Sequence, residues 1–172
     1  MENKWYVLHV KTGSELDIMK ALRSRGFTAT VPIESRMIRK GGNWTHQKYI
    51  LFSGYVFLYM NYELSKYYVL KGLYGVIKIL GGGKFPTPLS ESESEFILKL
   101  SDLLKEPSVL NFKDNNSYEI ISGFLTEYKD KIVKVERRYK KATVKITVAG
   151  EEKEIKVSFV EDTEQKPEQK KD

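Results

Sequence analysis

The 172-residue sequence contains no cysteine, and this absence excludes disulfide bonds and thiolate metal sites. It has only two histidines, His9 and His46, which lie too far apart in the sequence to suggest a metal cluster. No apolar run approaches the roughly 18–20 residues that a membrane helix needs. The first residues lack the apolar stretch of a secretory signal, because polar residues return by Lys11. We therefore expect a cytoplasmic protein without cofactors.

Patterns typical of catalysis are also lacking. The sequence shows no Ser-His-Asp arrangement and no paired carboxylates in an apolar setting. Gly81–Gly83 follow a predicted strand, but the GKS/T sequence that a phosphate-binding loop requires does not come after them. We expect a turn there, and we expect that the protein is not an enzyme.

Positive charge is present in excess and is unevenly distributed. Lys and Arg number 29 against 23 Asp and Glu, which gives a net charge of +6. The segment 129–145 concentrates basic residues, with Asp130 and Glu136 as its acidic members. Basic charge gathered on one face is typical of nucleic-acid binding, and a solvated β-surface is the alternative.

Residues 1–105 alternate between strand and helix patterns. The expected strands are 5–10, 28–31, 52–60 and 76–80, and the expected helices are 14–25, 64–71 and 91–104. Ser14 and Ser90 are candidate N-caps, and Gly26 is a candidate left-handed C-cap. A basic hairpin is expected over 36–50, with its turn at Gly41-Gly42. This order predicts an α+β domain, in which helices cover an antiparallel sheet.

The periodicity changes after residue 105. Residues 106–116 contain Pro107 and two Asn and are expected to form a linker. From Ser117 the pattern becomes all-β, with apolar residues alternating over 142–148 and again over 155–159. Four or five short strands over 117–161 predict a small barrel. Residues 162–172 are charged and lack large apolar side chains, so we expect a disordered tail.

Three segments together resemble the N-terminal domain of the NusG family of bacterial transcription elongation factors. They are a Trp-Tyr strand, a Gly-Tyr-Val strand and a closing Gly-Val segment followed by glycines and prolines. The matching residues are Trp5, Tyr6, Gly54, Tyr55, Val56, Gly75, Val76, Gly81, Gly82, Pro86, Pro88, Leu89 and Ser90. The resemblance implies a monomeric protein that binds RNA polymerase and carries out no chemistry of its own.

The resemblance continues into the second half, where the family has a small SH3-like β-barrel with a KOW motif. Gly123 stands at the start of the corresponding loop. Phe124 replaces the usual proline, and Asp130 replaces a turn glycine whose left-handed geometry aspartate tolerates. These departures favour a specialised paralogue that resembles LoaP and, more distantly, RfaH.

The resemblance also implies two polymerase contacts. The side chains of His9, Tyr55 and Phe57 correspond to the groups that dock on the clamp coiled coil, and period-2 alternation places Tyr55 and Phe57 on one face. The alternative is that both aromatics are ordinary core residues. The second contact, with the gate loop, corresponds to Lys66, Tyr67 and Tyr68, whose alternative is to pack a short helix.

Candidate nucleic-acid contacts fall into two groups. The strongest are in the KOW segment, where Tyr139 offers a stacking face among cations: Lys129, Lys131, Lys134, Arg137, Arg138, Tyr139, Lys140 and Lys141. The second group is Lys11, Arg23 and Arg25, near the turn that approaches non-template DNA in specialised members. For both groups, solvated surface charge is the alternative.

The leading hypothesis is a transcription antitermination and elongation factor. It would hold the polymerase clamp through the first domain and a nascent RNA hairpin, in a leader transcript, through the second. Two alternatives stay open: a general factor that links polymerase to the ribosome or a termination factor, and a stand-alone RNA-binding protein.

Overall fold

The computed structural model describes residues 2–164, and contacts divide them into two units. The first unit comprises residues 2–33, 50–100 and 147–153, and the second comprises residues 34–49, 101–146 and 154–164. The predicted boundaries at residues 105 and 117 divide the chain into two consecutive segments. The contacts instead assign the segment 34–49 to the second unit and the turn at 147–153 to the first.

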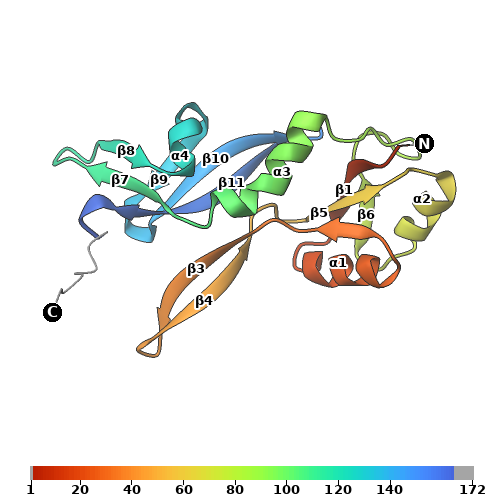
Figure 1. Cartoon of the computed structure of the whole chain (residues 1–172), viewed down its shortest axis with the longest axis horizontal. Coiled ribbons are helices and arrows are strands. Elements are labelled where there is room, and N and C mark those ends of the chain that lie inside the picture. The colour runs from red at the N-terminus through yellow and green to blue at the C-terminus, as the bar shows by residue number, and fades with distance from the viewer. Residues whose placement is uncertain (1, 165–172) are drawn as a thin grey trace. The chain divides into compact units, whose positions relative to one another are not determined.

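The first unit contains a four-stranded sheet in the order β2-β5-β1-β6. The central pair is antiparallel, with Leu8 opposite Val56 and His9 opposite Tyr55. Figure 1 shows helices α1 and α2 beside this sheet. The elements are β1 Lys4–Val10, α1 Glu15–Ser24, β2 Thr28–Thr30, β5 Tyr55–Met60, α2 Leu64–Lys71, β6 Val76–Ile79 and α3 Glu91–Leu103.

One face of this sheet forms the main core of the unit. Side chains that alternate along β1 and β5 pack with Ile18 and Leu22 of α1 and Leu70 of α2. Burial of such side chains contributes roughly 1.5–3 kcal/mol each. The sheet members of the cluster are Tyr6, Leu8, Val10, Ala29, Val56, Leu58, Met60 and Ile79. The predicted α+β arrangement is confirmed.

A buried carboxylate joins the start of α1 to the start of β5. Glu15 accepts hydrogen bonds from the backbone N–H of Gly13 at 2.8 Å and of Gly54 at 2.7 Å. The predicted role of Ser14 is wrong, because its side chain makes no capping hydrogen bond. Gly54 has φ +78, and a Cβ there would lie 3.3 Å from the carbonyl oxygen of Val10. Glycine therefore fits this close approach.

Helix α3 begins with the predicted N-cap. The hydroxyl of Ser90 accepts a hydrogen bond from the N–H of Glu93 at 3.2 Å, and the carboxylate of Glu93 accepts one from the N–H of Ser90 at 2.8 Å. This reciprocal pair is a capping box. Over residues 2–164, no helix is both long enough and apolar enough to cross a membrane.

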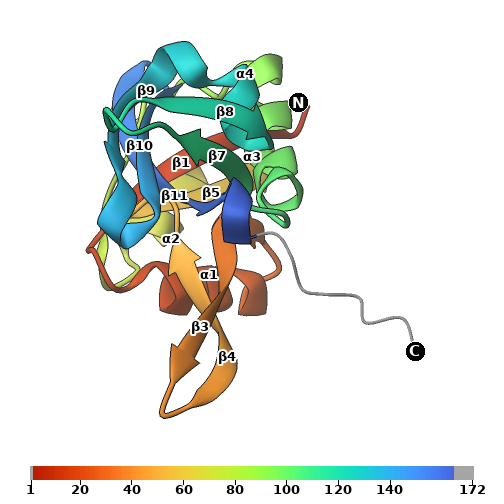
Figure 2. The same cartoon turned by 90° about the vertical axis from the view of Figure 1, so that its left-hand side faces the viewer.

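The second unit is built on a five-stranded sheet in the order β8-β7-β11-β10-β9, which curls around its core (Figure 2). Val144, Ile155 and Val157 are fully buried, as the alternation of apolar residues predicted. The turn between β10 and β11 has positive φ at Ala149 and Gly150, as a tight hairpin requires. The elements are β7 Ser108–Phe112, β8 Tyr118–Ser122, α4 Phe124–Glu127, η1 Lys129–Lys131, β9 Ile132–Glu136, η2 Arg137–Tyr139, β10 Lys141–Val148, β11 Glu151–Glu161 and η3 Asp162–Glu164.

Two predictions for this half need correction. Ser108–Phe112 was expected in a linker but forms β7, which pairs with β8 and, in parallel, with β11. Asp130 lies in the short helix η1 and not in left-handed backbone. Of the predicted tail, residues 162–164 form η3, and residues 165–172 lie outside the described part of the chain.

Gly123 occupies a position in the second unit that leaves no room for a side chain. Its φ is +94, and a Cβ would lie 2.5 Å from the Cα of Ser108. The hydroxyl of Ser108 in turn accepts a hydrogen bond from the N–H of Leu125 at 3.0 Å. This contact between backbones holds the loop that begins with Gly123 against β7.

A two-stranded hairpin completes the second unit. Strands β3 Ile33–Lys40 and β4 Asn43–Ile50 form it, with the turn at Gly41-Gly42. Both views show the turn lying away from the five-stranded sheet (Figures 1 and 2). The predicted hairpin is confirmed.

We expect that Glu15→Ala will lower the free energy of unfolding by about 2 kcal/mol or more, because two buried N–H groups lose their acceptor. Urea denaturation followed by circular dichroism measures the change. Asp17→Ala is the matched control, since Asp17 is an exposed acid in the same first turn. Equal effects of the two substitutions would contradict the bridging role of Glu15.

Candidate functional site

The predicted aromatic face exists as a set of cross-strand neighbours. His9 lies opposite Tyr55, and Val7 lies opposite Phe57. The ring centroids of His9 and Tyr55 are 6.1 Å apart, and those of Tyr55 and Phe57 are 6.5 Å apart, both in edge-on geometry. The prediction that these side chains share a face is therefore confirmed. This face is opposite the helix-covered core, because the core takes the alternating residues.

The aromatic face is covered in this structure. Tyr55 and Phe57 are at most 1% exposed, and His9 is half-buried. The hydroxyl of Tyr55 donates a hydrogen bond to Glu151 at 2.7 Å, and the ammonium of Lys153 lies 4.3 Å from the centroid of its ring. Burial, and secondarily the Glu151 carboxylate, raise the pKa of Tyr55. The turn at 147–153, which supplies these contacts, belongs to the same unit.

The same turn is held by one further hydrogen bond. The N–H of Ala149 donates to the carboxylate of Glu93 at 3.0 Å. Glu93 is also the capping residue of α3, so one carboxylate group serves both contacts. We define the covering turn as residues 147–153.

The side chains of the second expected contact lie on α2 with unequal exposure. Tyr68 is exposed, whereas Tyr67 packs against the core. Their rings are edge-on at 5.4 Å. The ammonium of Lys66 donates to the carbonyl oxygen of Asn61 at 2.8 Å, and that of Lys84 lies 5.7 Å from the ring centroid of Tyr68. Tyr68 is therefore the member best placed to contact a partner.

Three basic residues of the first unit do not form one cluster. Lys11 precedes α1, whereas Arg23 and Arg25 lie at its C-terminal end, about 15 Å away at the rise of a helix. Arg23 donates to the carbonyl oxygen of Ala29 and Arg25 to that of Ala21, both at 2.9 Å. Part of the donor capacity of both arginines is thus used within the unit.

An acidic residue neutralises part of the basic segment in the second unit. Glu161 accepts two hydrogen bonds from the guanidinium of Arg137, at 3.0 and 2.8 Å, and one from Lys140 at 2.6 Å. These bonds lower the pKa of Glu161 to about 2. Lys134 likewise pairs with Glu136 at 3.0 Å. The net charge of the segment therefore overstates the charge that it offers to a ligand.

The residues best placed to meet a ligand lie at η2. Arg138 is exposed, and its guanidinium lies 5.8 Å from the ring centroid of Tyr139, which is 63% exposed. Lys129 and Lys131 are exposed on η1, and Lys141 lies 5.5 Å from the ring centroid of Tyr49. An exposed arginine beside an exposed tyrosine offers both charge and a stacking face.

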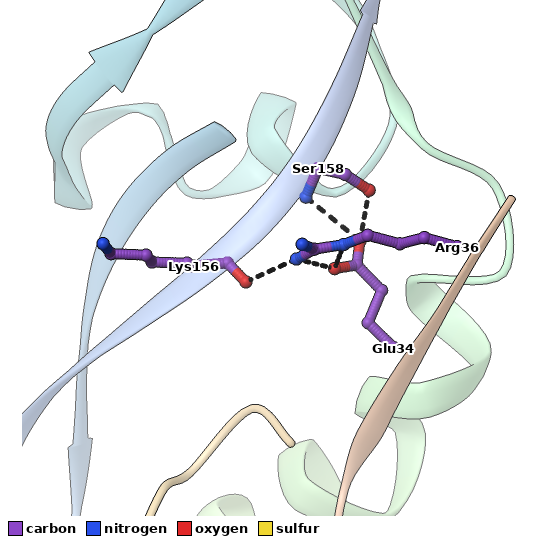
Figure 3. A network of polar contacts seen from close by, with 4 residues as sticks. All are labelled: Glu34, Arg36, Lys156 and Ser158. Carbon is purple, nitrogen blue, oxygen red and sulfur yellow. Dashed lines mark hydrogen bonds and ion pairs between the residues drawn. The ribbon is translucent and has the colours of Figure 1, made fainter. Parts of the chain in front are cut away.

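Sequence reasoning missed a polar network that fixes the base of the β3–β4 hairpin to β11 (Figure 3). The buried carboxylate of Glu34 pairs with Arg36 and accepts hydrogen bonds from the N–H of Ser158 at 3.0 Å and its hydroxyl at 2.6 Å. Arg36 also donates to the carbonyl oxygen of Lys156 at 3.1 Å. The partners are more than a hundred residues apart, so no local pattern marks them.

Comparisons with known proteins agree on one family. The family model described as "Transcription termination factor nusG" matches residues 3–98, more than half of the chain. The chain is 27% identical to the transcription termination/antitermination protein NusG of Bacillus subtilis, over 94% of its length and 98% of the relative. It is 26% identical to the protein of that name from Staphylococcus aureus, over 91% and 92%.

A solved structure supports the fold. The structure titled "Domain interaction in Thermotoga maritima NusG" matches with a TM-score of 0.52 and 18% identity, over 92% of this chain and 94% of that one. At this identity the match bears on the fold alone.

We expect Glu161→Gln to destabilise the fold near neutral pH, because the charged partners of Arg137 and Lys140 are lost. The folded-state pKa of about 2 lies below the ordinary 4.5. The contribution of the carboxylate is therefore fully present above about pH 4.5 and is lost as the pH falls toward 2. Urea denaturation of both proteins at several pH values measures the difference in free energy of unfolding.

The matched control for this prediction is Glu119→Gln, since Glu119 is an exposed acid on β8 of the same unit. A difference between wild type and Glu161→Gln that stayed constant from neutral pH to about pH 2 would contradict the assignment.

Proposed function

This chain belongs to the NusG family of transcription termination and antitermination factors, which are not enzymes, and from that premise we propose a specialised antitermination factor. Its first unit binds the RNA polymerase clamp, and its second unit binds an RNA hairpin in a nascent leader transcript. The observation that carries the proposal is that one chain has both an aromatic sheet face, in the first unit, and an exposed Arg-Tyr pair, in the second.

The aromatic face suits a protein partner. His9, Tyr55 and Phe57 form a contiguous set on rigid strands, and rigid aromatics give a large contact area at a low cost in side-chain entropy. Tyr68 on α2 supplies the second contact, with the gate loop. Docking through Tyr55 requires that the covering turn first leaves the face, so polymerase binding competes with the Tyr55–Glu151 hydrogen bond.

The second unit suits an RNA partner. Its exposed Arg138 and Tyr139 combine a forked donor with a stacking face, as recognition of unpaired loop bases requires. Lys129 and Lys131 add positive charge on η1. Tethering polymerase and RNA through one chain raises the local concentration of each near the other, so neither contact need be strong alone.

A general NusG-type factor is the second candidate, and the nearly full-length match to the Bacillus subtilis protein favours it. Transcription in vitro through an intrinsic terminator separates the two. Readthrough that depends on the transcribed leader supports the specialised factor. An effect on pausing that is the same on every template supports the general one.

We expect His9→Ala with Tyr68→Ala to weaken binding to core RNA polymerase about tenfold or more, because two partner-facing rings are lost. Titration of labelled protein with purified polymerase measures the affinity. Tyr74→Ala is the control, since Tyr74 is 90% exposed and lies outside the proposed contacts. Wild-type affinity in the double variant would rule out these contacts.

Tyr55→Phe extends the same test to the covering turn. It keeps the ring and removes the hydroxyl that bonds Glu151, so we expect polymerase affinity equal to or above that of wild type. A loss of affinity would contradict this expectation and would mean that the hydroxyl contributes more to polymerase binding than its bond to Glu151 takes away.

We expect Arg138→Ala with Tyr139→Ala to weaken binding to a short RNA hairpin at least tenfold. The dependence of log affinity on log salt should become shallower by about 0.7–0.9, because one phosphate contact is lost. Lys99→Ala with Tyr74→Ala removes one cation and one exposed aromatic elsewhere and serves as control. Unchanged RNA affinity with normal polymerase binding would reject the RNA site and leave the polymerase contact standing.

A further inference from the structure

The β3–β4 hairpin carries positive charge without any acidic residue in its exposed part. From Ser35 to Ile50 the sequence has two arginines and two lysines and no Asp or Glu. The one acid of the hairpin, Glu34, is buried at its base and paired with Arg36. An anionic ligand that approaches the hairpin therefore meets no like charge on it.

The two faces of the hairpin have different roles. Side chains alternate between the faces along each strand. Two contacts show which residues of β3 and β4 lie on the same face of the hairpin. The ring of Tyr49 lies 4.2 Å from the guanidinium of Arg36, so these two share one face. The hydroxyl of Ser35 lies 3.4 Å from Nδ1 of His46, so these two share the other.

The Arg36 face is occupied at the base of the hairpin by contacts within the second unit, and it is exposed toward the turn. Arg36 bonds the carbonyl oxygen of Lys156, and Lys141 of β10 lies on the ring of Tyr49 (Figure 3). Glu34, on the same face, bonds Ser158. The base of the ribbon is thereby fixed in place, which leaves the opposite face for a ligand.

The opposite face is exposed at every position. We call it the Trp44 face. Trp44 is 65% exposed and Met37 is 51% exposed, in a chain that has only two tryptophans. The members of the face are Ser35, Met37 and Arg39 of β3 and Trp44, His46 and Lys48 of β4.

We propose that the Trp44 face binds single-stranded nucleic acid, with a base stacked on the indole of Trp44 and phosphates contacted by Arg39 and Lys48. Trp44 and Met37, both more than half exposed on one face, form an apolar patch of the kind that marks an interaction site, and the exposed part of the hairpin that carries them has cations and no acids. Stacking of a base on an aromatic ring between cations is how single strands are bound without sequence preference. The residues differ from those proposed above for the RNA hairpin, so the two sites can fail separately.

The two tryptophans give a direct test. Trp5 lies on β1 with its ring 5.2 Å from Tyr59, and Trp5→Phe leaves Trp44 as the sole indole. Oligo-dT and oligo-U of about twelve nucleotides are titrated into full-length Trp5→Phe protein, and indole fluorescence is recorded. We expect quenching that saturates, since stacking on a base quenches the indole. Comparing the two oligomers shows whether DNA or RNA is preferred.

Substitutions connect the signal to the named side chains. In the Trp5→Phe background, Arg39→Ala with Lys48→Ala should weaken binding at least tenfold and make the salt dependence shallower by about 1.4. Lys99→Ala with Lys105→Ala removes the same charge from α3 and the segment just after it and should have no effect. In the wild-type background, Trp44→Ala should weaken binding at least fivefold, and Trp44→Phe should weaken it by less. Fluorescence anisotropy of the labelled oligomer measures both affinities.

Four results would overturn the proposal. One is oligomer binding, seen by anisotropy, without quenching of Trp44. Another is the absence of any binding at low salt. A third is equal binding of a blunt duplex, because paired bases cannot stack on Trp44. Quenching that survives Arg39→Ala with Lys48→Ala but is lost in Arg138→Ala with Tyr139→Ala would assign the strand to η2 instead, and the RNA site proposed there would stand.

Discussion

The carboxylate of Glu15 fixes the geometry on which the aromatic face depends. It joins the turn before α1 to the turn before β5 by accepting from the N–H groups of Gly13 and Gly54. Gly54 also accepts from the N–H of Val10 at 2.8 Å, so β1, α1 and β5 meet at one point. The next residue along the chain is Tyr55, and its register opposite His9 follows from this junction. The carboxylate of Glu15 can be buried here because two N–H donors satisfy it.

Features that arise from short-range patterns could be predicted from the sequence. The alternation of apolar residues in β10 and β11, the capping box at Ser90 and the turn at Gly41-Gly42 each depend on residues a few positions apart. Features that depend on distant partners could not. Strand β7 has little apolar alternation and is a strand because β8 and β11 pair with it. The sharing of one face by Tyr55 and Phe57 follows from alternation, whereas its covering by Glu151 does not.

The number of basic residues in a segment does not by itself give the charge that a ligand meets. The segment 129–145 is strongly basic in sequence, yet Glu161 satisfies Arg137 and Lys140, and Glu136 satisfies Lys134. The β3–β4 hairpin has fewer cations, but its one acid is used internally by Arg36. What a ligand senses is the charge left after internal pairing, and this depends on the fold.

The network at the hairpin base has a consequence for how this protein can change over generations. Glu34, Arg36 and Ser158 satisfy one another across two segments that are far apart in the gene. Replacing Ser158 alone leaves a buried carboxylate short of donors, and replacing Glu34 alone leaves Arg36 without its counter-charge. The hairpin therefore cannot be exchanged between related chains by itself. If recombination carries residues 33–50 into a related chain, the hairpin stays fixed at its base only where β11 of that chain offers the same donors.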